Sequence, residues 1–213
     1  MALVFYDLDG TLLRGLSSEK RFFVFLLRGG VLGLRQLQAF VLYAIRWYTR
    51  LRKEVWKKNK AYLAGLSQIK VQHLAEQFVC QVLLPDLHPF VKRRLDDHRT
   101  QGDIAVLLTG TPDFIARPIA QHLGINHVAA TVCNTMNGHF TSSPPNIHPF
   151  GADKLLIAAR MCQNLNTKLE NCTAYADASS DIALLASVLR PVVVCPNRKM
   201  RQIAMRRGWE IIG

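Results

Sequence analysis

Two acidic residues follow the first predicted strand of the sequence. Leu3 to Tyr6 is an uninterrupted apolar run that ends in Asp7-Leu8-Asp9-Gly10-Thr11, which is typical of a buried strand leaving a sheet at a glycine turn. Because residues two apart in a strand point to the same side, we expect Asp7 and Asp9 to leave this strand side by side. Two neighbouring ionised carboxylates need a proton or a cation to neutralise them. The spacing therefore predicts a cation or acid–base site at the carboxyl end of the strand.

Two further acids occupy a similar position later in the chain. Asp177 ends a predicted strand over 172–176, and Asp181 follows four residues later at the start of a predicted helix. Three carboxylates that converge from separate strand ends are typical of a site for a hard cation. Oxygen ligands with room for phosphate and water suit Mg²⁺.

Other residues at the same sheet edge are suited to an anion. Thr109 ends the second predicted strand, and the Gly110-Thr111-Pro112 that follows predicts an exposed backbone, an N-cap and a first-turn proline at a helix start. Free backbone N–H groups and the helix dipole favour phosphate there. Lys154 lies in the first turn of a helix predicted over 152–163, where the dipole disfavours a cation, so a role away from its own helix is indicated.

Strands that alternate with helices predict an α/β layer fold with a mostly parallel sheet. One connection is too long for this pattern, because 100 residues separate Asp9 from Thr109 whereas a βαβ unit needs only about 30. The connection is therefore predicted to hold an all-helical insertion, with a core at 1–14 and 88–213 and the insertion at 15–87. Helices within it are predicted over 19–27, 34–63 and 69–83.

The formal net charge of +12 is concentrated in this insertion. Residues 14–70 hold 13 of the 27 basic residues and only two acids, a net charge of +11. If this segment forms a continuous helix, one apolar stripe is predicted to pack inside the insertion. A second stripe is aromatic, and the basic residues lie on another side of the helix. The inner stripe comprises Leu34, Leu37, Val41, Ala44, Tyr48 and Leu51, the aromatic stripe Phe40, Tyr43 and Trp47, and the basic face Arg35, Arg46, Arg50, Lys53 and Lys57.

The basic face has three interpretations that the sequence leaves open. It could be a solvated face or one turned to an anionic substrate, it could lie on an anionic membrane surface, or it could bind nucleic acid. The longest charge-free stretch around it, Gln36 to Ile45, has ten residues and is too short to span a bilayer. No recognised nucleic-acid motif accompanies the charge.

Composition indicates a folded chain in a reducing compartment. Apolar residues make up 49% of the sequence, which argues against disorder. The five cysteines are odd in number and scattered, with no metal-binding spacing. The N-terminus has no basic region before its first acid, so we expect neither a signal peptide nor a membrane anchor. We expect a cytoplasmic location, which includes the periphery of the inner face of the membrane.

Over essentially its whole length the chain resembles the haloacid dehalogenase superfamily. Four signature elements occur in the family's order: the D-x-D-G-T motif at Asp7, then Thr109, Lys154 and Asp177 with Asp181. The helical insertion after the first motif is similar to that of the phosphoserine phosphatase-like branch, which includes class C phosphatidylglycerophosphatases and histidinol-phosphate phosphatases. The resemblance implies a Rossmann-like three-layer core with a helical cap.

The resemblance also implies a role for each matched residue. Asp7 would attack phosphorus and form an aspartyl-phosphate, and Asp9 would act as general acid and then general base. Mg²⁺ would be held by Asp7, the backbone carbonyl of Asp9 and Asp177, with Asp181 behind them ordering a water or a lysine. The equatorial phosphoryl oxygens would be stabilised by Thr109, the Gly110 N–H and Lys154.

The implied activity is that of a Mg²⁺-dependent phosphomonoester hydrolase acting on a small phosphorylated metabolite. One alternative is a lipid phosphatase at a membrane surface, such as a phosphatidylglycerophosphatase, and a remote one is a non-catalytic nucleic-acid-binding protein. Many members of this branch carry an acid soon after the first motif, where this chain has Gly15-Leu16-Ser17-Ser18. The missing acid weakens the case for an amino-bearing substrate such as phosphoserine.

Overall fold

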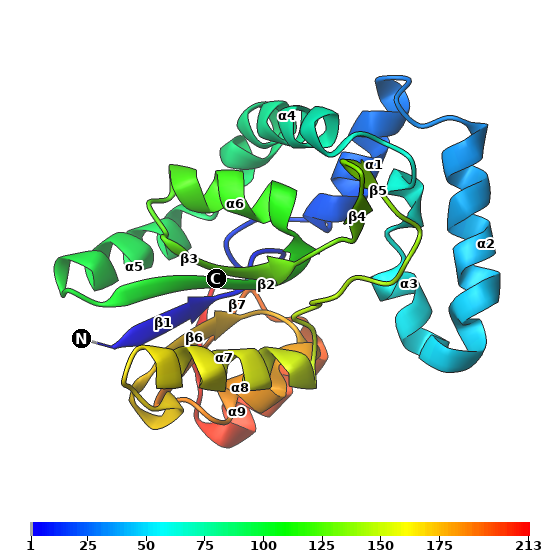
Figure 1. Cartoon of the computed structure of the whole chain (residues 1–213). Helices are drawn as coiled ribbons and strands as arrows, with labels where there is room; N and C mark the ends of the chain where they lie inside the picture. Colours follow the sequence, from blue (N-terminus) through cyan, green and yellow to red (C-terminus); the bar gives the residue numbers. More distant parts are fainter. Residues whose placement is uncertain (1) are drawn as a thin grey trace.

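A six-stranded parallel sheet forms the centre of the molecule (Figure 1). The computed structural model describes residues 2–213, apart from the side chain of Lys53. Met1 of the predicted core and the Lys53 side chain of the predicted basic face therefore lie outside the described residues. The strand order is β3-β2-β1-β6-β7-β8. The strands are β1 (Leu3–Tyr6), β2 (Ile104–Pro112), β3 (His127–Thr131), β6 (Thr173–Ala176), β7 (Arg190–Val194) and β8 (Glu210–Ile212).

Burial on both faces explains why the central strands read as continuous apolar runs. All four residues of β1 are buried, and the strand pairs with β2 on one side and with β6 on the other. A parallel strand covered on both faces has no solvent side, so polar alternation is absent. The predicted α/β class with a mostly parallel sheet is confirmed.

Helices cover both faces of the sheet and give three layers. One apolar core joins the sheet to α5 (Pro89–Thr100) and α6 (Asp113–His122), together with α1 (Ser18–Arg28) and α4 (Gln68–Phe78) of the insertion. A second core on the other face joins it to α7 (Ala152–Asn164), α8 (Ile182–Leu185) and α9 (Arg198–Arg207). The two groups lie above and below the sheet in Figure 1. The three-layer, Rossmann-like arrangement is therefore confirmed.

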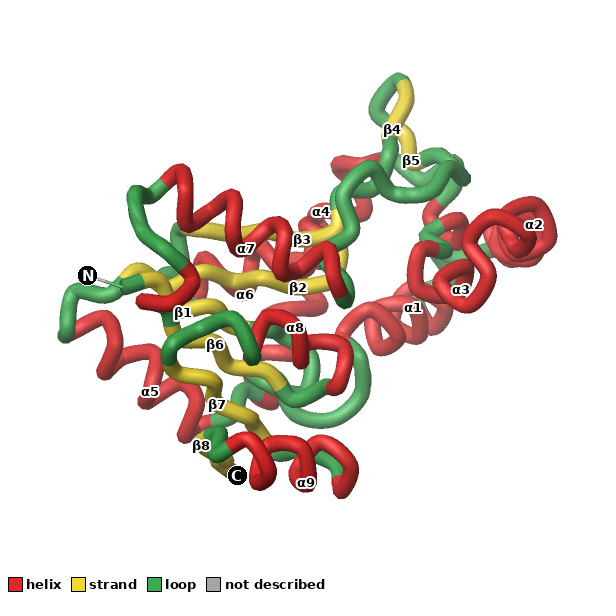
Figure 2. The backbone as a smooth tube through the Cα atoms, turned by 90° about the horizontal axis from the view of Figure 1, so that it is seen from below, coloured by secondary structure: helices red, strands yellow, loops and turns green. Residues whose placement is uncertain are grey.

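The long connection between β1 and β2 is helical, as predicted. It contains α1 (Ser18–Arg28), α2 (Leu34–Leu51), α3 (Val55–Lys58) and α4 (Gln68–Phe78), followed by a π-helical turn at Val79–Leu83. No helix within residues 2–213 has both the length and the apolar character that crossing a bilayer requires. In the views of Figures 1 and 2, α2 lies at the edge of the molecule, away from the sheet.

The prediction of one helix over 34–63 is wrong. The α2 helix ends at Leu51 because Arg52 has a φ of +47°, outside the right-handed helical region. The chain then folds back against α2, where the Tyr43 hydroxyl donates to the Lys58 carbonyl at 3.0 Å and the Asn59 amide donates to the Phe40 carbonyl at 2.9 Å. These bonds join α3 and the segment after it to the side of α2.

The predicted inner stripe of this helix is also wrong. Leu34 is 73% exposed and Tyr48 is 61% exposed, whereas Tyr43 is buried. The buried side carries the aromatic stripe: Tyr43 and Trp47 pack in one cluster with Val55, and Phe40 packs against the main core. Aromatic side chains bury more apolar area than aliphatic ones, so this side is the more favourable one to cover. Of the predicted inner residues Leu34, Leu37, Val41, Ala44, Tyr48 and Leu51, Ala44 is buried, Leu51 is partly buried and the other four are exposed.

A short hairpin links the core to the insertion. Strands β4 (Thr135–Met136) and β5 (His139–Phe140) flank Asn137-Gly138, whose positive φ values of 51° and 74° fit a tight hairpin turn. Backbone N–H groups of the insertion donate to this hairpin, from Gln68 to the Gly138 carbonyl and from Gly65 to the Phe140 carbonyl, both at 2.8 Å. The hairpin therefore fixes the insertion over the carboxyl edge of the sheet.

Candidate active site

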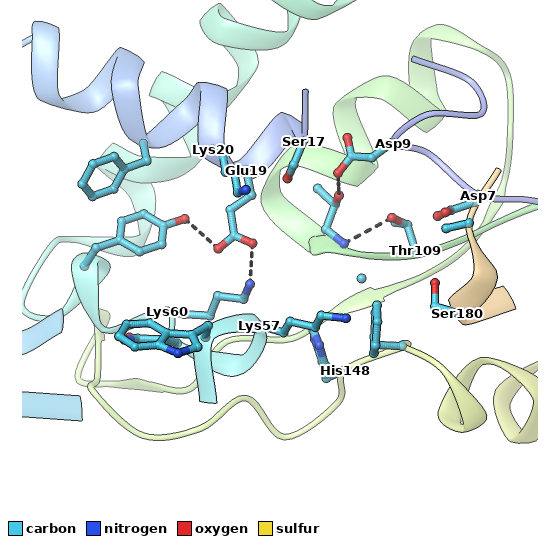
Figure 3. Close-up of a pocket in the computed structure, with 18 of the residues that line it drawn as sticks. Asp7, Asp9, Ser17, Glu19, Lys20, Lys57, Lys60, Thr109, His148 and Ser180 are labelled. Carbon is cyan, nitrogen blue, oxygen red and sulfur yellow. Dashed lines mark hydrogen bonds and ion pairs between the residues drawn. The ribbon is translucent and has the colours of Figure 1, made fainter. Parts of the chain in front are cut away.

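The predicted acids and their partners meet where three adjacent strands end. Asp7 follows β1, Asp177 follows β6, and Thr109 lies near the end of β2. Parallel pairing places these ends at one edge of the sheet, so residues about 100 positions apart share a single pocket (Figure 3).

Lys154 provides the positive charge at this edge. It is the third residue of α7, whose N-cap Gly151 has a φ of +57° that allows the chain to enter the helix there. Its side chain is buried, and Nζ lies 2.9 Å from Asp7 Oδ1 and 2.9 Å from Asp181 Oδ1. Although burial alone lowers the pKa of Lys154, these two carboxylates raise it above its ordinary value. The lysine is therefore a buried ammonium between two acids.

The acids form a cluster that fits a divalent cation. Carboxylate oxygens of Asp7, Asp177 and Asp181 lie within 4.8 Å of one another. Asp177 Oδ1 is buried and accepts no hydrogen bond from the described residues. Burial and the charges of Asp7 and Asp181 raise the pKa of Asp177 to about 7. Oxygen ligands with an uncompensated buried charge suit a hard cation, so the donor set is consistent with Mg²⁺.

Gly10 leaves room for this cluster. It has a φ of +78°, and a Cβ atom at this position would collide with the Asp177 carboxylate. Any larger residue would therefore displace Asp177. This steric limit explains why the D-x-D-G-T motif has glycine at this position.

Asp9 follows Asp7 by two residues and lines the same pocket. Its carboxylate accepts from the Ser18 backbone N–H at 2.8 Å and from the Thr111 hydroxyl at 3.2 Å. Burial raises the pKa of Asp9, although these hydrogen bonds oppose the rise. The predicted capping role of Thr111 and first-turn position of Pro112 are wrong, because β2 continues through Pro112 and α6 begins at Asp113. The extended strand instead turns the Thr111 hydroxyl toward Asp9.

A cavity of about 860 Å³ lies between this cluster and the insertion. Asp7, Asp9 and Lys154 line its floor together with Thr109, Gly110 and Asp177, while Asp181 lies behind Lys154. The structure therefore brings the predicted site residues together around one space. Apolar and aromatic side chains from the insertion and from the loop before α7 form its walls: Phe23, Val24, Phe40, Trp56 and Phe150.

Family comparison agrees with this geometry. The model of haloacid dehalogenase-like hydrolases matches residues 4–186, which include all the site residues named above. The chain belongs to this hydrolase family. Family membership and the names of its relatives together make it a phosphatase.

Related proteins carry phosphatase names. The chain is 29% identical to phosphoserine phosphatase SerB1 of Mycobacterium tuberculosis, over 99% of this chain and 70% of that protein. It is 24% identical to a histidinol-phosphatase of Neisseria meningitidis serogroup C, over 99% of this chain and 97% of that protein. A crystal structure of a protein of unknown function from Bordetella pertussis matches with a TM-score of 0.85 and 26% identity, covering 100% and 98% of the two chains.

The wall of the pocket contains a charge pair that the sequence did not predict. Lys60 is buried and pairs with Glu19, and the Tyr62 hydroxyl donates to the same carboxylate at 3.2 Å. Figure 3 shows this group on the cap side of the pocket. The carboxylate of Glu19 is thus already neutralised. The scarcity of acids in the insertion was the one sequence signal that could have drawn attention to Glu19.

His148 is a second residue whose role the sequence did not predict. Its Nδ1 lies 2.9 Å from the Thr131 hydroxyl, which donates to the Gly110 carbonyl at 2.6 Å. Because that hydroxyl proton is engaged, Nδ1 must carry the imidazole proton and donate. Burial and nearby lysines lower the pKa of His148 to about 3, so the ring is neutral. These two hydrogen bonds hold the β2 backbone at Gly110, directly after Thr109.

Proposed function

We propose that this phosphatase hydrolyses a phosphomonoester through an aspartyl-phosphate formed on Asp7. The observation that carries the proposal is the position of Lys154, with its ammonium 2.9 Å from both Asp7 and Asp181 at the floor of an 860 Å³ cavity. A carboxylate oxygen of Asp7 would form the new P–O bond while the bond to the leaving oxygen breaks. Attack by a carboxylate splits one difficult displacement into two easier ones.

Asp9 would move the protons of both steps. It would donate a proton to the leaving oxygen and then accept one from the water that hydrolyses the acyl phosphate. The Ser18 N–H and the Thr111 hydroxyl hold its carboxylate beside the pocket. This fixed position favours proton transfer without a large movement of the side chain.

Positive charge and hydrogen-bond donors would stabilise the phosphoryl oxygens. Lys154, the Thr109 hydroxyl and the Gly110 N–H are the groups suited to this role, and Lys154 and Thr109 are nearly completely buried. Donors fixed in a buried site stabilise developing charge without reorganising. Mg²⁺, held by Asp7, Asp177 and the Asp9 carbonyl with Asp181 behind Lys154, would supply charge neutralisation and Lewis acidity.

The test uses p-nitrophenyl phosphate, whose leaving group needs no protonation. We expect Mg²⁺-dependent release of p-nitrophenol that EDTA abolishes and that Asp7→Asn removes. Asp9→Asn should form the intermediate but hydrolyse it slowly, giving a burst of a single equivalent of p-nitrophenol and an acid-stable phosphoprotein. Full activity of Asp7→Asn, or no turnover of any phosphomonoester with Mg²⁺, would contradict the proposal.

The first substrate candidates are small phosphorylated metabolites. Relatives named phosphoserine phosphatase and histidinol-phosphatase make O-phospho-L-serine and L-histidinol phosphate the first compounds to test. The cavity is large enough for either, since its volume lies within the range of ordinary ligand pockets.

A lipid phosphomonoester is the second candidate, and the walls of the pocket favour it. Phe23, Phe40 and Trp56 present apolar surface, while Lys60 already neutralises Glu19. An ammonium on the leaving group would therefore gain little from Glu19. Comparing kcat/KM for phosphoserine and histidinol phosphate with that for micellar phosphatidylglycerophosphate separates the candidates. Turnover of the soluble substrates alone would exclude the lipid.

A further inference from the structure

The outer side of α2 is an unpartnered apolar surface. Five residues at helical spacing, i, i+3, i+7, i+11 and i+14, run along it, with Leu42 beside them. Leu34 is 73% exposed and Ile45 is 71% exposed, although aliphatic side chains of this size are usually buried. We call this surface the α2 outer face; it consists of Leu34, Leu37, Val41, Leu42, Ile45 and Tyr48.

Nothing in the described part of the chain covers this face. The opposite side of α2, where Tyr43 is buried, already packs against α3 and the segment after it. Figures 1 and 2 both place α2 at the periphery of the molecule. A contiguous exposed apolar surface of this kind is typical of an interaction site.

The charge around the face identifies its partner. α2 contains no acid, and Arg35, Arg46 and Arg50 are exposed along its polar side. None of the three forms an ion pair with the described side chains, in contrast to Arg21 and Arg94, which do. Two copies of this segment, each with a net charge of +11 over residues 14–70, would repel each other. An anionic surface would attract it.

A hollow at the carboxyl end of α2 continues this surface. It has a volume of about 960 Å³ and is lined by two arginines, two aromatic residues, a leucine and a glutamate. The glutamate, Glu54, pairs with Lys58 at 2.8 Å and not with either arginine, so both arginines are available to bind an anion. Arginine beside Tyr and Trp suits the headgroup level of a membrane, where phosphate and hydrocarbon meet. The lining residues are Tyr48, Arg50, Leu51, Arg52, Glu54 and Trp56.

We propose that the α2 outer face binds the surface of an anionic phospholipid bilayer. The helix would lie in the plane of the membrane, with its aliphatic side chains among the acyl chains and its arginines at the phosphates. The inference concerns binding alone and does not depend on the proposed reaction.

Vesicle sedimentation of the full chain tests the proposal. We expect binding to phosphatidylcholine vesicles that contain phosphatidylglycerol, weaker binding to phosphatidylcholine alone, and loss of binding as salt rises. Ile45→Glu should weaken binding to the anionic vesicles by about tenfold or more, because it places a charge among the acyl chains. Ile69→Glu on α4 is the matched control, since Ile69 is 70% exposed but lies outside the face, and its binding should be unchanged.

Activity on p-nitrophenyl phosphate and the circular dichroism spectrum show that each variant is folded. If Ile45→Glu does not fold, the neutral double variant Leu42→Ser/Ile45→Ser is used, with the same expected loss of binding. Equal binding by Ile45→Glu and Ile69→Glu would overturn the proposal. So would a concentration-dependent dimer of the wild-type protein that Ile45→Glu dissociates, or salt-sensitive binding to DNA without binding to vesicles.

Discussion

Replacing Lys154 with Met would remove the positive charge between two buried carboxylates. The side chain of Lys154 is 4% exposed, and its ammonium lies 2.9 Å from Asp7 and from Asp181. Methionine keeps most of the volume but leaves both acids without a cation. Removing one partner of a buried ion pair typically costs about 3–5 kcal/mol, so the free energy of unfolding should fall by that amount.

The same substitution should lower activity by about 10²- to 10³-fold in kcat, which is the usual effect of removing one donor to a developing anion. Unfolding in urea at pH 7.5 with EDTA measures the stability, and release of p-nitrophenol with Mg²⁺ measures the activity. Lys199→Met is the control, because Lys199 is exposed and such surface changes usually stay within about 0.5 kcal/mol.

A second variant separates lost charge from lost packing. Lys154→Met/Asp181→Asn removes one of the two unpaired acids, so it should recover part of the stability that Lys154→Met loses, while activity stays low. If Lys154→Met is as stable as the wild type, or if Asp181→Asn restores nothing in its presence, the buried lysine does not hold this acidic cluster together, and the reasoning is refuted.

Three further substitutions test separate features of the structure. Gly10→Ala should abolish most activity, since its Cβ would displace Asp177, whereas Gly15→Ala, with open space around it, should retain activity in the same assay. His148→Phe should resist acid: the wild type loses stability as pH falls below 6.5, because the unfolded imidazole takes up a proton that the folded one, with a pKa of about 3, does not. Urea unfolding measures the free energy of unfolding of both proteins at pH 7 and at pH 5. Between these two pH values the wild type should lose about 2 kcal/mol more than His148→Phe. Arg52→Gly should raise the melting temperature by relieving the positive φ, a gain of about 1 kcal/mol that Arg52→Ala should not give.

The set of residues at the carboxyl edge of the sheet could be predicted from the sequence because local signals specify it. The apolar run Leu3 to Tyr6 predicts a strand, and residues that follow parallel strands must meet at one edge. The acids that end β1 and β6 therefore converge by topology alone. The resemblance then supplied a role for each, and those roles stay predictions until the variants are measured.

The surroundings of the site could not be read in the same way. Thr111 satisfies the pattern of a helix cap, yet β2 continues past it and its hydroxyl bonds Asp9, 102 residues away in the sequence. Glu19 and Lys60 are likewise paired only because the insertion folds back on itself. Sequence spacing carries no information about such distant partners.

The sequence by itself determined the parallel sheet, the helical insertion and the set of residues at the carboxyl edge, because hydrophobic period and motif spacing act over a few residues. Only the tertiary structure decided which side of α2 is covered. Apolar residues surround most of that helix, so the hydrophobic period allows either the aliphatic or the aromatic side to be buried. The chain reverses direction at Arg52 and packs α3 against the aromatic side, which is therefore the buried one. Whether a residue is buried depends on which other segments pack against it. The aliphatic side of α2 remains exposed because no other part of the described chain packs on it.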